Sequence, residues 1–80
     1  MNKSEVFQTF QSVFDSAFLD SVTVTPDLSA KDVEEWDSLL HVSLVLAVED
    51  AFGVRFRVGE VEAVKNMDQW ADLILRKLNK

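Results

Sequence analysis

Residues 35–53 read EWDSLLHVSLVLAVEDAFG, and this stretch decides the fold class of the chain. Its apolar residues recur at spacings of three and four, the period of an amphipathic helix. Asp37 or Ser38 can cap the start of such a helix, and Gly53 stands where a left-handed residue commonly ends one. We therefore predict a helix over residues 38–52. Its core-facing stripe is His41, Leu44, Val45, Val48 and Phe52.

Two further helices are predicted on either side of this one. Residues 4–19 place phenylalanines on a single stripe, with Ser4 as a plausible N-cap. Residues 67–78 form the last helix, in which Asn66 and Gln69 have capping-box spacing and Lys77 and Lys80 suit the C-terminal end. The predicted core stripes are Phe7, Phe10, Phe14 and Phe18 in the first helix, and Met67, Trp70, Ile74 and Leu78 in the last.

The connections between these helices differ in length. Residues 20–37 form a long loop around Pro26, the only proline, and apolar side chains scattered through it can hold it against the core. Val54, Phe56 and Val58 alternate with arginines, but a single strand has no partner, so we favour an extended connection. Residues 59–64 can make one short helical turn. The prediction is an all-α, small four-helix bundle of three main helices and one short helix, forming one domain over residues 1–80.

Charge and composition narrow the classes of partner. The net charge is −6, and residues 27–62 carry nine acids and three bases, so the whole surplus lies there. Nucleic acid is an unfavourable partner for such a surface, whereas a basic protein surface is a favourable one. The chain has no cysteine, no apolar run long enough to cross a bilayer and no signal-peptide pattern. We therefore expect a cytoplasmic monomer that does not bind membranes.

Few residues of the chain can carry chemistry. The only histidine, His41, lies one helical turn after Ser38, but no oxyanion-hole motif accompanies the pair, and no metal-binding motif is present. We therefore expect no enzyme and no metal. Ser38 stands alone among the seven serines in preceding a long apolar helix, where an exposed hydroxyl would meet a helix end that favours phosphate. The plainer interpretation is that Ser38 only caps the helix.

The context of Ser38 resembles the acyl carrier proteins and the related peptidyl carrier domains. The motif is Asp37-Ser38-Leu39 at the head of a helix that ends in the acidic, phenylalanine-terminated run of residues 48–54. Thr25-Pro26-Asp27 resembles the early loop of the family, and Asn66-Met67-Asp68 resembles the start of its last helix. The resemblance covers nearly the whole chain. It implies that Ser38, flanked by Asp37 and Leu39, receives a 4′-phosphopantetheine arm from coenzyme A through a magnesium-dependent phosphopantetheinyl transferase.

The same resemblance implies a role and a set of partners. The arm would carry acyl or aminoacyl groups as thioesters and present them to acyl-loading and acyl-transferring enzymes with basic surfaces. Exposed apolar residues would dock these partners and acids would steer them; the expected partner-binding residues are Leu40, Leu46, Glu49, Asp50, Glu60 and Glu62.

Two positions depart from the common pattern of fatty-acid carriers. Acids usually stand two residues after the serine and near position 43, where this chain has Leu40 and Ser43. The form Trp36-Asp37-Ser38-Leu39 is more similar to stand-alone carriers of specialised pathways, which favours polyketide, nonribosomal peptide or acyl-modification chemistry. The alternative is a helical adaptor that binds partners non-covalently through the same acidic and apolar surface.

Overall fold

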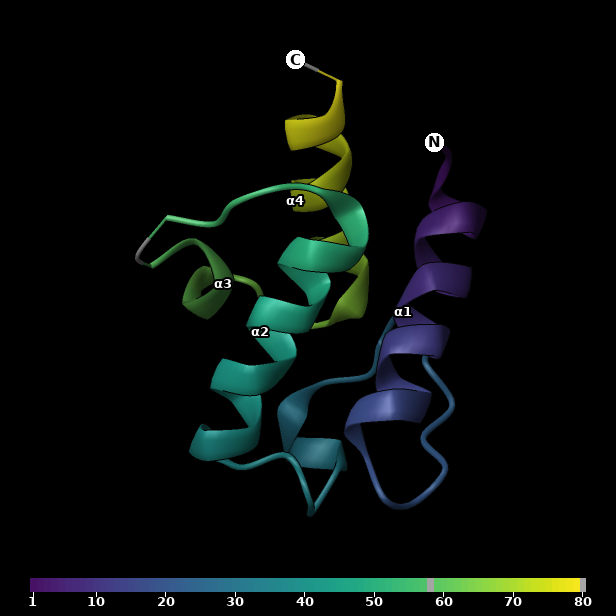
Figure 1. Cartoon of the computed structure of the whole chain (residues 1–80), viewed down its shortest axis with the longest axis vertical. Helices are drawn as coiled ribbons and strands as arrows, with labels where there is room; N and C mark the ends of the chain where they lie inside the picture. Colours follow the sequence, from purple (N-terminus) through teal and green to yellow (C-terminus); the bar gives the residue numbers. More distant parts are fainter. Residues whose placement is uncertain (58, 80) are drawn as a thin grey trace.

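The computed structural model describes residues 1–57 and 59–79, and it is built from helices. The elements are α1 (Lys3–Ala17), a 3₁₀ turn η1 (Ala30–Asp32), α2 (Ser38–Phe52), α3 (Glu60–Ala63) and α4 (Met67–Leu78). Helix α2 runs antiparallel to α1, and the long loop between them crosses the end of the bundle where α2 begins (Figure 1). The predicted all-α bundle of three long helices and one short helix is confirmed, and no strand occurs in the part of the chain described.

Helix α1 starts earlier than predicted because a different residue caps it. The Asn2 side chain accepts from the Glu5 amide at 2.9 Å, and the Glu5 carboxylate accepts from the Asn2 amide at 3.0 Å. This reciprocal capping box satisfies two amides at once, so Ser4 is an exposed residue of the first turn and not the N-cap. The phenylalanine stripe is confirmed, with Phe7 half-buried and the other three rings buried.

The core forms where α1, α2 and α4 meet. The Phe10 ring lies 5.6 Å from the Phe52 ring and 5.4 Å from the Trp70 ring, measured between centroids. Of the stripe predicted in α2, Leu44, Val48 and Phe52 are buried, whereas His41 and Val45 are half-buried. In α4 the prediction for Leu78 was wrong: this residue is 36% exposed, because it lies in the last turn of the helix.

The long loop is held to the helices by hydrogen bonds as well as by apolar packing. Gln11 of α1 donates to the Val22 carbonyl oxygen at 2.7 Å and accepts from the Val24 amide at 2.9 Å. Farther along, the Leu28 carbonyl accepts from the Met67 amide at 2.9 Å and so ties the loop to the start of α4. The loop is therefore part of the folded bundle, and it reaches α2 in a fixed position.

Residues 54–57 form neither helix nor strand, in keeping with the connection that the alternating pattern predicted, and Val58 lies outside the described residues, as does Lys80. Gly53 ends α2 with φ of 66°, a left-handed conformation that strains any residue with a Cβ. The Phe56 amide donates to the Glu49 carboxylate at 2.7 Å, which fixes the connection against α2. No helix in the described part of the chain is long and apolar enough to cross a membrane.

Candidate functional site

Ser38 is the first residue of α2, and its side chain is exposed to solvent. The sequence left two possible caps, and the structure assigns that role to Asp37, whose carboxylate accepts from the Leu40 amide at 2.9 Å. The Ser38 hydroxyl is thus not required as the N-cap. The first-turn amides of a helix lack partners within the helix and create a positive end, which favours an anionic group at this hydroxyl.

The two residues before Asp37 hold the start of α2 in place. Glu35 accepts from the backbone amides of Leu19 at 2.8 Å and Asp20 at 3.3 Å, which ties the loop to the segment after α1. The Trp36 ring makes edge contacts with the rings of Phe14 and Phe18, at centroid distances of 5.4 and 5.9 Å. The local sequence gives no sign of these contacts, because the amides that Glu35 binds lie fifteen and sixteen residues away.

His41 serves the packing of this region. Its Nδ1 atom accepts a hydrogen bond of 3.1 Å from the indole Nε1–H of Trp36, and the two rings stack at 6.1 Å with an interplanar angle of 24°. An imidazole nitrogen that accepts from an indole is not free to accept a proton from a serine. The geometry therefore gives His41 a structural role at the start of α2.

Three apolar residues of α2 face solvent on one stripe. Leu39 is 83% exposed, Val42 60% and Leu46 55%, and their spacings of three and four place them on adjacent turns. Leu40, also predicted to bind partners, is half-buried and packs against the core. The exposure of Val42 was not predicted, although its helical spacing from Leu39 and Leu46 places it on the same face. We call Leu39, Val42 and Leu46 the exposed stripe.

The four predicted partner-binding acids fall into two groups. Glu49 and Glu60 are half-buried and already engaged: Glu49 accepts from the Phe56 amide, while Glu60 accepts from the Arg57 amide at 2.6 Å and pairs with Lys77 at 2.8 Å. The backbone hydrogen bond from Arg57, followed by the contact with Lys77, lowers the pKa of Glu60 below its ordinary value. Asp50 and Glu62 are exposed. The structure therefore separates acids that hold the fold together from acids that face solvent.

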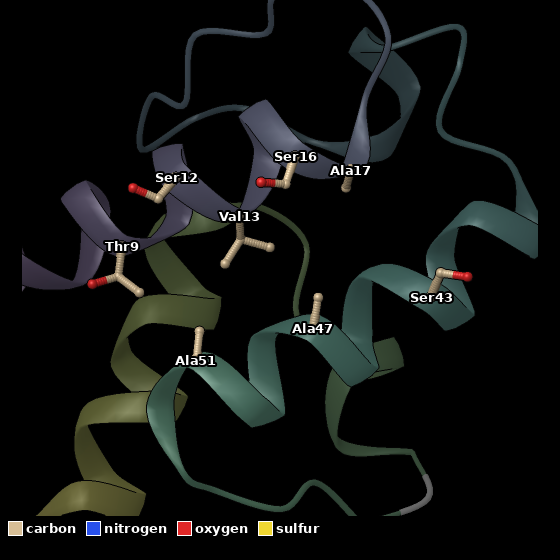
Figure 2. A pocket seen from close by; sticks show the side chains of 8 residues that line it. All are labelled: Thr9, Ser12, Val13, Ser16, Ala17, Ser43, Ala47 and Ala51. Atoms are coloured by element: carbon tan, nitrogen blue, oxygen red, sulfur yellow. The ribbon is translucent and has the colours of Figure 1, made fainter.

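A shallow groove lies between α1 and α2. Small side chains line it from both helices: Thr9, Ser12, Val13, Ser16 and Ala17 from α1, and Ser43, Ala47 and Ala51 from α2 (Figure 2). None of the predicted site residues lines this groove. It does contain Ser43, one of the two positions at which the sequence departs from fatty-acid carriers.

The fold and site define a small helical protein that presents one serine hydroxyl at a fixed helix end beside an exposed apolar stripe. A scan against protein-family models finds no match. The chain is, however, 35% identical over 80 residues to an acyl carrier protein of Petrotoga mobilis, covering 99% of this chain and 94% of that one. It is also 32% identical over 79 residues to an acyl carrier protein of Guillardia theta, covering 98% of both chains.

A solved structure shows the same architecture. The solution NMR structure of a holo acyl carrier protein from Geobacter metallireducens matches with a TM-score of 0.75 and 35% sequence identity, covering 96% of this chain and 85% of that one. The chain belongs to the acyl carrier protein family. Members of this family are carriers without catalytic activity of their own and bear a covalently attached 4′-phosphopantetheine, so this protein is an acyl carrier and not an enzyme. Their partners include phosphopantetheinyl transferases and acyl-handling enzymes.

Proposed function

We propose that Ser38 is the residue that carries the phosphopantetheine arm. The observation that supports this most directly is its setting: an exposed hydroxyl at the first position of α2, with the cap supplied by Asp37. The residues present fit a phosphate diester, because the helix N-terminus offers backbone N–H groups and a positive dipole to its negative charge. The bound arm supplies the thiol that holds an acyl group as a thioester, a group that this cysteine-free chain lacks.

The protein's own part in this role is to position the attachment point. Glu35 and Trp36 fix the loop that leads into α2, and the Asp37 cap keeps the first turn formed. A transferase that binds this end of the bundle would meet the hydroxyl in one orientation, which lowers the entropic cost of bringing the reacting groups together.

We further propose that the exposed stripe, with Asp50 and Glu62, is the surface that partner enzymes bind. The three apolar side chains offer area to bury, and the exposed acids attract a basic surface over longer range. Leu39 lies next to the attachment serine, so an enzyme docked on the stripe would face the start of the arm. Leu40 belongs to the same proposal, and its half-buried side chain also packs against the core.

We also propose that the carrier acts in a specialised acyl pathway and not in housekeeping fatty-acid synthesis. The support is the replacement of two expected acids by Leu40 and Ser43, one packed against the core and the other in the α1–α2 groove. A partner that needs acids at those two places would lose both contacts. The monomeric state and the cytoplasmic location remain predictions from the sequence.

The attachment proposal is tested by mass spectrometry of the intact protein. The apo protein is incubated with coenzyme A, Mg²⁺ and a broad-specificity phosphopantetheinyl transferase. We expect the mass to rise by one phosphopantetheine in the wild type and in the matched control Ser43→Ala, which removes the other hydroxyl of α2. Ser38→Ala is expected to gain nothing. An unchanged wild-type mass, or an equal gain in Ser38→Ala, would overturn the proposal.

A further inference from the structure

The outer side of α2 is more apolar than a surface helix of a small bundle requires. Its inner side buries Leu44, Val48 and Phe52 in the core. Its outer side carries the exposed stripe and, next to it, Ala47 and Ala51 of the α1–α2 groove. A helix that is apolar all round is normally covered on every side. We therefore expect another molecule to cover the side of α2 that the bundle leaves open.

The α1–α2 groove is open because the side chains that line it are short. On its core side the two helices are joined by large rings, such as Phe10 and Phe52 at 5.6 Å between centroids. On its outer side, Val13 of α1 and Ala47 and Ala51 of α2 point into the space between the helices (Figure 2). The hollow that remains measures about 500 Å³. Short side chains on two helical walls leave room for the larger side chains of a third helix.

The charges beside the groove are negative. On α1, the exposed Asp15 follows the groove residue Ser12 by three positions, so it borders the groove. On α2, the exposed Asp50 stands in the same relation to Ala47. The only lysine or arginine of the two helices is Lys3, and its ammonium group is paired with two aspartates of α4 at 2.6 and 3.0 Å. A second copy of the chain would bring acids against acids, whereas a basic helix would be attracted.

We propose that the α1–α2 groove binds an amphipathic helix of a partner protein, with large apolar side chains on one face and lysine or arginine along its edges. The large side chains would fill the space above the small wall residues, and the basic edges would meet Asp15 and Asp50. This surface lies beside the exposed stripe but is distinct from it. The phosphopantetheine arm is not needed for such binding, so the inference holds or fails whether or not Ser38 is modified.

The test uses the apo protein and a synthetic peptide as the probe. The peptide is about as long as the 15-residue α2 and consists of leucines on one helical face and lysines on the other. Binding is followed by the ¹⁵N–¹H spectrum of the carrier. We expect amide shifts centred on residues 9–17 and 43–51. Two control peptides should bind far more weakly: one has the same residues in an order that scatters the leucines, and the other has glutamate in place of lysine.

Groove-filling variants test the location of the peptide. Ser12→Leu and Ala51→Leu add bulk from opposite walls at exposed positions, so the bundle should keep its thermal midpoint. Each should weaken peptide binding about tenfold, because the added side chain takes the space that a leucine of the peptide needs. Ala63→Leu is the matched control, since it adds the same side chain at an exposed position of α3 outside the groove. Its affinity should equal that of the wild type.

A charge reversal tests the choice of a basic partner. Asp50→Lys should weaken binding about fivefold, and Glu34→Lys, the same change at an exposed acid of the long loop, should have a much smaller effect. The preference for the lysine peptide over the glutamate peptide should shrink at about 1 M NaCl, where the screening length falls to about 3 Å.

Three results would overturn the inference. The first is an absence of binding, or equal binding of the leucine–lysine peptide and its scattered control. The second is equal affinity of the wild type and both groove-filling variants, or shifts confined to the exposed stripe. The third is a set of groove shifts that grow with carrier concentration in the absence of peptide, which would make a second copy the occupant. Failure of Ser38 to accept phosphopantetheine would refute the attachment proposal and leave all these readouts unchanged.

Discussion

Replacing Asp37 by alanine should destabilise the bundle by a predictable amount. The carboxylate accepts from the Leu40 amide at 2.9 Å and places a negative charge at the N-terminus of α2. Losing an N-cap acceptor costs about 1 kcal/mol, and losing the charge at the helix end costs about 0.5 kcal/mol more. The expected loss in the free energy of unfolding is therefore about 1.5 kcal/mol for Asp37→Ala. Asp37→Asn keeps the acceptor, so it should lose only about 0.5 kcal/mol.

Urea unfolding followed by circular dichroism measures both losses. With a denaturant slope of about 1 kcal/mol per molar for a domain of this size, the midpoint of Asp37→Ala should fall by about 1.5 M without a change in slope. Asp50→Ala is the matched control, because it removes an exposed acid from the same helix without removing a cap. The reasoning is refuted if the alanine and asparagine variants at position 37 unfold at the same urea concentration, or if Asp50→Ala loses as much stability as Asp37→Ala.

Three further predictions concern the core, the pH dependence and the partner surface. Phe10→Ala should lower the free energy of unfolding by about 3–5 kcal/mol, a large part of the roughly 4–12 kcal/mol expected for a chain of this length. Its thermal midpoint should therefore fall far more than that of the half-buried control Phe7→Ala, and similar midpoints for the two variants would contradict the packing described. The pKa of Glu60 is lowered in the folded state, so the carboxylate stabilises the fold at any pH above its ordinary pKa of 4.5. This stabilisation is lost as the pH falls through the pKa of the folded state. The thermal midpoint of Glu60→Gln should therefore lie below that of the wild type at pH 7 and converge with it on acidification, and a constant gap down to pH 3 would argue against this. Leu46→Ser should leave the thermal midpoint nearly unchanged and raise the KM of a phosphopantetheinyl transferase for the carrier, and an unaltered KM would remove Leu46 from the docking surface.

Helix α2 shows what local sequence signals can predict. Its bounds at residues 38 and 52 were predicted correctly because a capping side chain stands at one end and a glycine at the other. Helix α1 shows how such signals compete, since Asn2 and Ser4 are both suitable caps. The choice falls on Asn2 because Glu5 stands three residues after it and completes the capping box, which no residue does for Ser4 in the structure.

The parts that escaped prediction depend on contacts between distant segments. Glu35 and Gln11 look like surface residues in the sequence, yet each binds backbone amides more than ten residues away. Periodicity also cannot tell whether anything covers a helix end, which is why Leu78 was wrongly assigned to the core. The candidate site shows the same difference between features with a local sequence signal and features that depend on distant contacts. The exposure of Ser38 was predictable from its place before an apolar helix, whereas the half-burial of Leu40 required the packed structure.

The most direct test of the central claim is to locate the arm on the chain. The protein is produced together with a phosphopantetheinyl transferase, digested, and its peptides are fragmented by mass spectrometry. Seven serines are available, and the account predicts that the phosphopantetheine lies on Ser38 alone. An arm found on any other residue, or a protein that stays unmodified while a known carrier in the same cells is modified, would contradict it.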